Sequence, residues 1–324
     1  MTWRRTRTAG RAAGRAACVA VVSLLAAACT GDEPGTYDEH LVISGGGTAG
    51  IYYGYGDELA AALSDRLGVT AEVLETGGSI ENLHDLASGS SQLAFSAADA
   101  AGDAVTGRPP FDVPLRLRAV ARVYDDFVHL VVEEDSDIAD IEDLRGRRVS
   151  LGADGSGTEL IARRLLLAAG VDPGDVDNAA MGIDESVAAL RSGTVEAFFW
   201  SGGLSTPGVK DLAEDVPIRL VDLWELVEPV RREYGGGYRH GVVPQGTYGL
   251  HSDVPTMAVP NYLLVDADAD ADLVYDVARV LFEQRAQIAR QVPAAALLDR
   301  SRAIYTASVE LHPGALRYYR EVKL

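Results

Sequence analysis

The chain has 324 residues, and its 48 acidic residues outnumber its 29 basic ones, which gives a formal net charge of −19 at pH 7. This excess of negative charge argues against a nucleic-acid partner, because phosphate backbones are bound through basic surfaces. The two cysteines are Cys18 and Cys29, so the region after Cys29 can form no disulfide and offers no thiol nucleophile.

Residues 1–28 have the pattern of a bacterial lipoprotein signal peptide. Five arginines between Arg4 and Arg15 precede an apolar stretch that ends directly before Cys29, and small residues before a cysteine resemble a lipobox. We therefore predict export and lipid modification of Cys29, which would anchor an extracytoplasmic protein to the cell membrane. A plain signal peptide with a chance cysteine is the alternative. A spanning anchor is disfavoured, because the stretch falls short of the ~20 residues that a span needs.

The polar residues 29–39 suit a short tether between the lipid and the folded domain. Without the five leader arginines, the chain has 24 basic and 48 acidic residues, a formal charge of −24. This charge does not exclude an anionic ligand, because helix N-termini act locally and long-range fields are screened beyond ~8–10 Å. The remaining ~290 residues are enough for two α/β lobes.

Alternating strands and helices predict an α/β fold with parallel strands. Strands are predicted at 41–44, 70–74, 93–96, 118–123, 129–133, 148–152, 197–200, 218–220 and 262–265. Helices are predicted at 57–67, 80–88, 98–105, 141–144, 158–169 and 183–192, followed by a helical series from about residue 272.

Three glycine-rich turns, at 45–50, 76–79 and 154–158, each connect a predicted strand to the following helix. The free N–H groups in the first turn of a helix attract anions, and each turn also carries a serine or threonine hydroxyl. Ligands of an open parallel sheet bind beyond the carboxyl ends of the strands. We therefore expect the three turns to face one cleft that binds a small anion.

The candidate ligand-binding residues come from these turns, from the helices that they open, and from the end of one strand. They are Gly47, Thr48, Tyr52, Gly78, Ser79, Asn82, Ser156, Gly157, Thr158, Trp200 and Ser201. Three consecutive glycines within 234–238 predict a mobile loop. Arg122 and Arg239 could pair with a ligand carboxylate, although a surface ion pair is the expected role of each.

The first turn also matches the G-x-G-x-x-G fingerprint of dinucleotide-binding proteins, and Glu72 or Glu75 follows at the distance of the ribose-binding acid. Gly54 and Gly56 argue against this alternative, because they should interrupt the helix that the fingerprint requires. The sequence contains no G-x-S-x-G elbow, no phosphate loop and no H-E-x-x-H motif. We therefore predict a protein that is no enzyme and that uses no cofactor or metal; a dinucleotide-dependent oxidoreductase is the remote alternative.

Seven motifs together resemble the TAXI-type solute receptors of TRAP transporters, which are exported proteins that deliver small organic acids to a membrane permease. The resemblance extends over residues 41–319. The motifs are Gly46–Tyr53, Thr76–Leu83, Leu93–Phe95, Gly155–Thr158, Ala197–Phe199 with Gly202 and Pro207, Asp253–Pro260, and Leu311–Ala315.

This resemblance implies a two-lobed, periplasmic-binding-protein-like fold of type II with a hinged cleft between the lobes. Lobe 1 would comprise residues 40–128 and 253–324, and lobe 2 residues 129–252, with crossovers near 129–133 and 247–264. The implied ligand is a small organic acid or amino acid, with glutamate-like dicarboxylic acids as the first expectation. The implied partner is a TRAP-type permease; a sensing receptor that partners a membrane histidine kinase is the alternative.

Three residues depart from the family pattern in ways that affect the ligand. Ala49 and Ile51 replace a Gly and a Thr in the first motif, and Ala97 stands where the family often carries Gln. The changes at Ile51 and Ala97 remove polar side chains. We therefore expect a less polar pocket than in the relatives and do not assume glutamate as the ligand.

Overall fold

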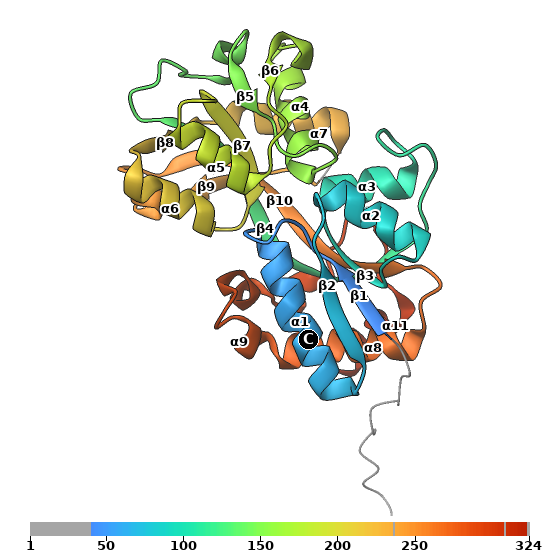
Figure 1. The fold of residues 1–324 in the computed structure, drawn as a ribbon. Helices are drawn as coiled ribbons and strands as arrows, with labels where there is room; N and C mark the ends of the chain where they lie inside the picture. The colour runs from blue at the N-terminus through green and yellow to red at the C-terminus, as the bar shows by residue number, and fades with distance from the viewer. Residues whose placement is uncertain (1–39, 236, 308, 323–324) are drawn as a thin grey trace, which may run out of the picture. The chain divides into compact units, whose positions relative to one another are not determined.

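A computed structural model describes residues 40–235, 237–307 and 309–322 of the protein. The predicted signal peptide, the tether at 29–39 and Cys29 lie outside these residues. In the described part of the chain, no helix is long and apolar enough to cross a membrane. A ten-stranded mixed sheet forms the framework, and its main strand order is β2-β1-β3-β10-β4-β7-β5-β6 (Figure 1).

The first group of elements, which we call lobe 1, begins with three strand–helix units. Its parallel strands are β1 (His40–Ser44), β2 (Thr70–Leu74) and β3 (Leu93–Ala97). Its helices are α1 (Ile51–Leu67), α2 (Ser79–Ser88) and α3 (Ala98–Thr106), and later α8 (Ala271–Glu283), α9 (Arg285–Ile288), α10 (Arg300–Ala303) and α11 (Pro313–Glu321). Neighbouring residues of β3 pack on opposite faces, with Phe95 on the side of α1 and α8, and Ala94 on the side of α2 and α3.

The second group, lobe 2, surrounds the other end of the sheet. Its strands are β5 (Arg148–Ser150), β6 (Asp177–Asn178), β7 (Ala197–Gly202), β8 (Ile218–Leu220) and β9 (Arg239–Val243). Its helices are α4 (Gly157–Ala168), α5 (Ile183–Arg191), α6 (Pro207–Asp215) and α7 (Val227–Tyr234). Short 3₁₀ turns lie at Ile141–Leu144, Pro173–Asp175, Trp224–Leu226 and Thr247–Gly249, and a further one in lobe 1 at Pro293–Leu297.

Two long antiparallel strands, β4 (Leu117–Glu133) and β10 (Val254–Asp266), join the lobes (Figure 1). β10 pairs with β3 in lobe 1, and β4 pairs with β7 in lobe 2. We predicted two separate strands at 118–123 and 129–133, and the polar residues Asp125 and Asp126 lie between them. The segment is nevertheless one continuous strand, since the neighbouring β10 pairs with it across this interruption.

Helix α1 begins at Ile51, six residues earlier than predicted, and contains both Gly54 and Gly56. A methyl group on Gly56 would lie 2.8 Å from Val73 Cγ2, so glycine lets α1 approach β2 closely. These glycines therefore do not interrupt the helix start, and the prediction that they do is wrong. The segments α6, α7 and β9 were not predicted.

A buried polar cluster connects the two lobes on one side of the sheet. Arg164 of α4 forms an ion pair with Asp103 of α3 and donates a hydrogen bond of 2.7 Å to the hydroxyl of Tyr238, which in turn donates to Asp99 over 2.7 Å. The guanidinium group lies 4.3 Å from the centre of the Tyr234 ring. Arg164, Asp103, Tyr238 and Asp99 are all buried. Tyr238 is thus fixed in the core, so the prediction of a mobile loop is wrong for this residue.

We expect Asp103→Ala to lower the free energy of unfolding by about 3–5 kcal/mol, because it removes the nearer of the two carboxylates that pair with the buried guanidinium of Arg164 and leaves only Asp99, at 3.6 Å. Urea unfolding followed by circular dichroism measures this change. Glu196→Ala is the matched control, since it removes an exposed carboxylate that pairs with Arg147 and should change the stability little. A similar small effect of both substitutions would contradict the role that we assign to the cluster.

Candidate functional site

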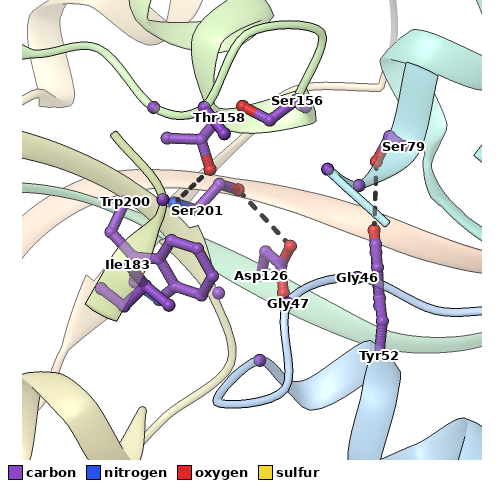
Figure 2. A pocket seen from close by; sticks show the side chains of 18 of the residues that line it. Gly46, Gly47, Tyr52, Ser79, Asp126, Ser156, Thr158, Ile183, Trp200 and Ser201 are labelled. Atoms are coloured by element: carbon purple, nitrogen blue, oxygen red, sulfur yellow. Dashed lines mark hydrogen bonds between the residues drawn. The ribbon is translucent and has the colours of Figure 1, made fainter. Parts of the chain in front are cut away.

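The starts of three helices border one cavity. The N-caps of α1, α2 and α4 are Gly50, Gly78 and Ser156, and each belongs to one of the three glycine-rich turns. The end of β7 and the start of α5 complete the wall (Figure 2). The cavity encloses about 130 Å³.

Nine of the eleven candidate ligand-binding residues line this cavity. They are Gly47, Tyr52, Gly78, Ser79, Ser156, Gly157, Thr158, Trp200 and Ser201. The structure thus brings together residues that are up to 154 positions apart, from both lobes.

Thr48 and Asn82 are not part of the lining. Thr48 is exposed. The amide group of Asn82 is fully buried; it donates to the carbonyl oxygens of Gly45 and Phe95 and accepts a hydrogen bond from the hydroxyl of Thr76. Asn82 therefore holds the first two turns against β3, and its predicted contact with the ligand does not agree with this geometry.

The hydroxyl groups of Ser79 and Thr158 face the cavity as hydrogen-bond donors. Ser79 Oγ accepts from the N–H of Ala97 over 3.1 Å, and Thr158 Oγ1 accepts from the N–H of Ser201 over 3.2 Å. Because these acceptor contacts are made to the backbone, the hydroxyl hydrogens can be directed to a ligand. Tyr52 Oη donates its own hydrogen to Asn261 Oδ1 and lies 3.5 Å from Ser79 Oγ (Figure 2). Together with the first-turn N–H groups of α1, α2 and α4, the hydroxyls of Ser79 and Thr158 favour an anionic group.

Two of these helix starts, those of α2 and α4, are in contact across the boundary between the lobes. A methyl group on Gly157 would lie 2.8 Å from Ser79 Oγ, and one on Gly78 would lie 3.7 Å from the Cβ atom of Ser156. Gly78 also has a φ of 120°, which residues with a side chain rarely adopt. The glycines therefore allow the two N-termini to approach the same space.

Asp126, which the sequence analysis missed, lies in β4 and lines the cavity. Its Oδ2 accepts a long hydrogen bond of 3.4 Å from Ser201 Oγ (Figure 2). Its buried Oδ1 has no hydrogen-bond partner among the described residues. Burial raises the pKa of this carboxyl to about 7, and the neighbouring acidic groups Asp125 and Asp99 raise the pKa further, while the nearby amide of Asn261 and the hydroxyl of Ser201 oppose the shift. The sequence feature that could have indicated Asp126 is a pair of acidic residues between two strongly apolar strand segments.

An apolar wall faces the hydrogen-bond donors. Ile51, Ile183 and the ring of Trp200 form part of it, and Trp200 is oriented by a 2.8 Å hydrogen bond from Nε1 to Thr206 Oγ1. Two of the three departures from the family pattern, Ile51 and Ala97, also line the cavity. The lining is therefore less polar than the resemblance alone would suggest.

Among the described residues that line the cavity, none is a lysine or an arginine. Arg122 and Arg239 both pair with Asp125, at 2.7 and 2.8 Å, and neither reaches the cavity. Within the described ranges, no group of three or more His, Cys, Asp or Glu side chains is arranged to hold a metal ion. Any negative charge on a ligand must therefore be held by backbone N–H groups and hydroxyls.

The model of the NMT1-like family matches residues 43–322 of this chain. Similar solved structures include a protein of Bordetella bronchiseptica RB50, which is 19% identical and has a TM-score of 0.51, with 86% of this chain and 88% of that protein covered. Another is XAC2383 of Xanthomonas citri bound to ATP, which is 15% identical and has a TM-score of 0.50, with 87% of this chain and 95% of that protein covered. A third is PhnD1 of Prochlorococcus marinus MIT 9301 in complex with methylphosphonate, which is 13% identical and has a TM-score of 0.50, with 80% of this chain and 90% of that protein covered. The predicted fold class, a two-lobed α/β fold of the periplasmic-binding-protein kind, is confirmed.

We expect Asp126→Asn to stabilise the protein without ligand, and to do so more at pH 8 than at pH 5. The carboxyl binds its proton more tightly in the folded state, with a pKa of about 7, than in the unfolded chain, where a value of about 3.9 is typical. Its contribution to stability is therefore present below pH ~4 and is lost as the pH rises to ~7. Thermal unfolding of the wild type and of Asp126→Asn at the two pH values tests this. An equal difference in stability between the two proteins at pH 5 and at pH 8 would contradict it.

Proposed function

Because this chain belongs to the NMT1-like family and encloses a cavity lined by hydrogen-bond donors between two lobes, we propose that it is a receptor for a small solute that carries a carboxylate. It binds the solute and releases it unchanged to a membrane transporter. The observation that carries this proposal is the convergence of three helix starts on one cavity without a lysine or arginine.

The carboxylate is held from both lobes. Ser79 and the N-terminus of α2 belong to lobe 1, and Thr158 and the N-terminus of α4 belong to lobe 2. A ligand that binds both sets of donors favours the state in which the two helix starts lie close together. The proposed lobe boundaries, 40–128 with 253–324 and 129–252, place these two donor sets on opposite sides of the hinge.

The proposed transporter is a TRAP-type permease, since the motifs that resemble the TAXI receptors include all three turns at the cavity. A receptor of this kind works outside the cytoplasm. The signal-like residues 1–28 and the lipobox-like cysteine support export and a lipid anchor at Cys29.

The double variant Ser79→Ala and Thr158→Ala should weaken the binding of the best carboxylate ligand by roughly 100-fold or more, because each lost hydrogen bond to a charged group is worth about 1.5–3 kcal/mol. Isothermal titration calorimetry against a panel of organic acids and amino acids measures this loss. The matched control is Ser192→Ala with Thr194→Ala, an exposed pair on lobe 2, which should leave the affinity unchanged. The site assignment is overturned if the first double variant binds as tightly as the wild type.

Cys29→Ala should move the protein from the membrane fraction to the soluble extracytoplasmic fraction, because it removes the atom that carries the lipid. Cell fractionation with immunoblotting checks this outcome. Cys18→Ala, within the predicted leader, is the control and should leave the partition unchanged. Equal partition of the wild type and Cys29→Ala would contradict lipid anchoring.

A further inference from the structure

One oxygen of the buried Asp126 carboxylate lacks a hydrogen-bond donor among the described residues. Within the described part of the chain, Asp126 Oδ1 is buried and unpartnered, as is the amide nitrogen of the neighbouring Asn261. The hydrogen bond from Ser201 Oγ to Oδ2, at 3.4 Å, is the one that the carboxylate accepts from these residues. A buried polar atom without a partner is costly, and native proteins rarely keep one. Because Asp126 lines the cavity, a ligand can supply the missing donor.

In the described part of the chain, no cationic side chain lines the cavity beside the negative charge of Asp126. The groups that act on its charge are Asp125 and Tyr124 on its own strand, Tyr52 on α1, Asp99 on α3, Ser201 on β7 and Asn261 on β10. These neighbours are acidic or neutral. A positively charged group on the ligand would therefore compensate the charge of Asp126 at this end of the cavity.

The acceptor and the anion-binding donors lie next to each other. Ser201 connects them, because its backbone N–H donates to Thr158 Oγ1 and its hydroxyl donates to Asp126 (Figure 2). The carboxylate and the ammonium group of one amino acid are separated by a single carbon atom. Such a ligand can face both the helix starts and Asp126 at once.

The rest of the cavity suits a small apolar side chain. Ile51, Ile183 and Trp200 supply its apolar wall, and the volume of about 130 Å³ resembles that of an engineered apolar cavity of about 150 Å³ that holds benzene. A second carboxylate would meet no cationic side chain and would lie near the charge of Asp126.

We propose that the solute is a small neutral amino acid, whose carboxylate binds to the starts of α2 and α4 and whose ammonium group binds to Asp126. This proposal rests on the proposed function and specifies the ligand for the same cavity. It differs from the glutamate-like dicarboxylates that the family resemblance favours.

The test is calorimetry at pH 7 with exhaustively dialysed protein and three matched ligand groups. L-alanine and L-valine are the neutral amino acids, propionate and isovalerate are the same acids without the amino group, and succinate and L-glutamate carry a second carboxylate. We expect one of the neutral amino acids to bind best, at least tenfold more tightly than its deaminated partner and than either dicarboxylate. Asp126→Asn, in which a carboxylate oxygen becomes an amide donor, should remove this preference while the affinity for the deaminated acid does not fall.

The outcomes separate the two proposals. If a deaminated acid or a dicarboxylate binds as tightly as the best neutral amino acid, or if Asp126→Asn leaves the preference intact, the amino-acid inference fails while the receptor for a carboxylate stands. If no carboxylate binds to the wild type, the proposed function itself fails. The comparison of ligands on the wild type needs no variant, so it holds even where Asp126→Asn does not fold.

Proton exchange gives an independent readout. An ammonium group beside Asp126 stabilises the ionised carboxylate, so binding near pH 7 should release protons, and the affinity should rise as the pH increases through 7. Calorimetry in two buffers with different ionisation enthalpies measures this release, which should vanish in Asp126→Asn. Proton uptake on binding would mean that a protonated Asp126 donates to a ligand oxygen and would overturn the inference.

Discussion

The contact between the helix starts at Ser79 and Gly157 is the constraint on which the cavity depends. The two helices belong to different lobes, yet a single methyl group on Gly157 would come within 2.8 Å of Ser79 Oγ. This approach directs two sets of first-turn N–H groups and two hydroxyls at one small volume. The long strands β4 and β10 and the buried cluster around Arg164 hold the lobes so that this contact can form.

The attraction of the site for an anion is local, and it exists although the net charge of the chain is negative. A strongly acidic protein can bind an anion because helix N-termini act within their first turn, where solvent does not screen them. Asp126 is the exception within the cavity, since it is an acid next to an anion site. A buried carboxyl with a raised pKa costs stability at neutral pH, and such costs are typical of residues that serve binding rather than folding.

Much of the fold followed from local sequence signals. Alternating strands and helices, and glycine with serine or threonine at the turns, were enough to locate the turns that border the cavity, because these features depend on neighbouring residues. Asp126 was missed because its position in the cavity depends on the pairing of β4 with β10 and β7, which no local pattern shows. Asn82 was misassigned for a similar reason: its position on α2 directs its amide to backbone carbonyls of the sheet rather than to the ligand.

The most direct test of the account is a crystal structure of the protein with its tightest-binding amino acid. We predict the ligand carboxylate within hydrogen-bond distance of the N–H groups that open α2 and α4 and of the hydroxyls of Ser79 and Thr158, and its nitrogen within hydrogen-bond distance of Asp126 Oδ1. A ligand bound outside this cavity, or one that directs its carboxylate to Asp126, would contradict the account.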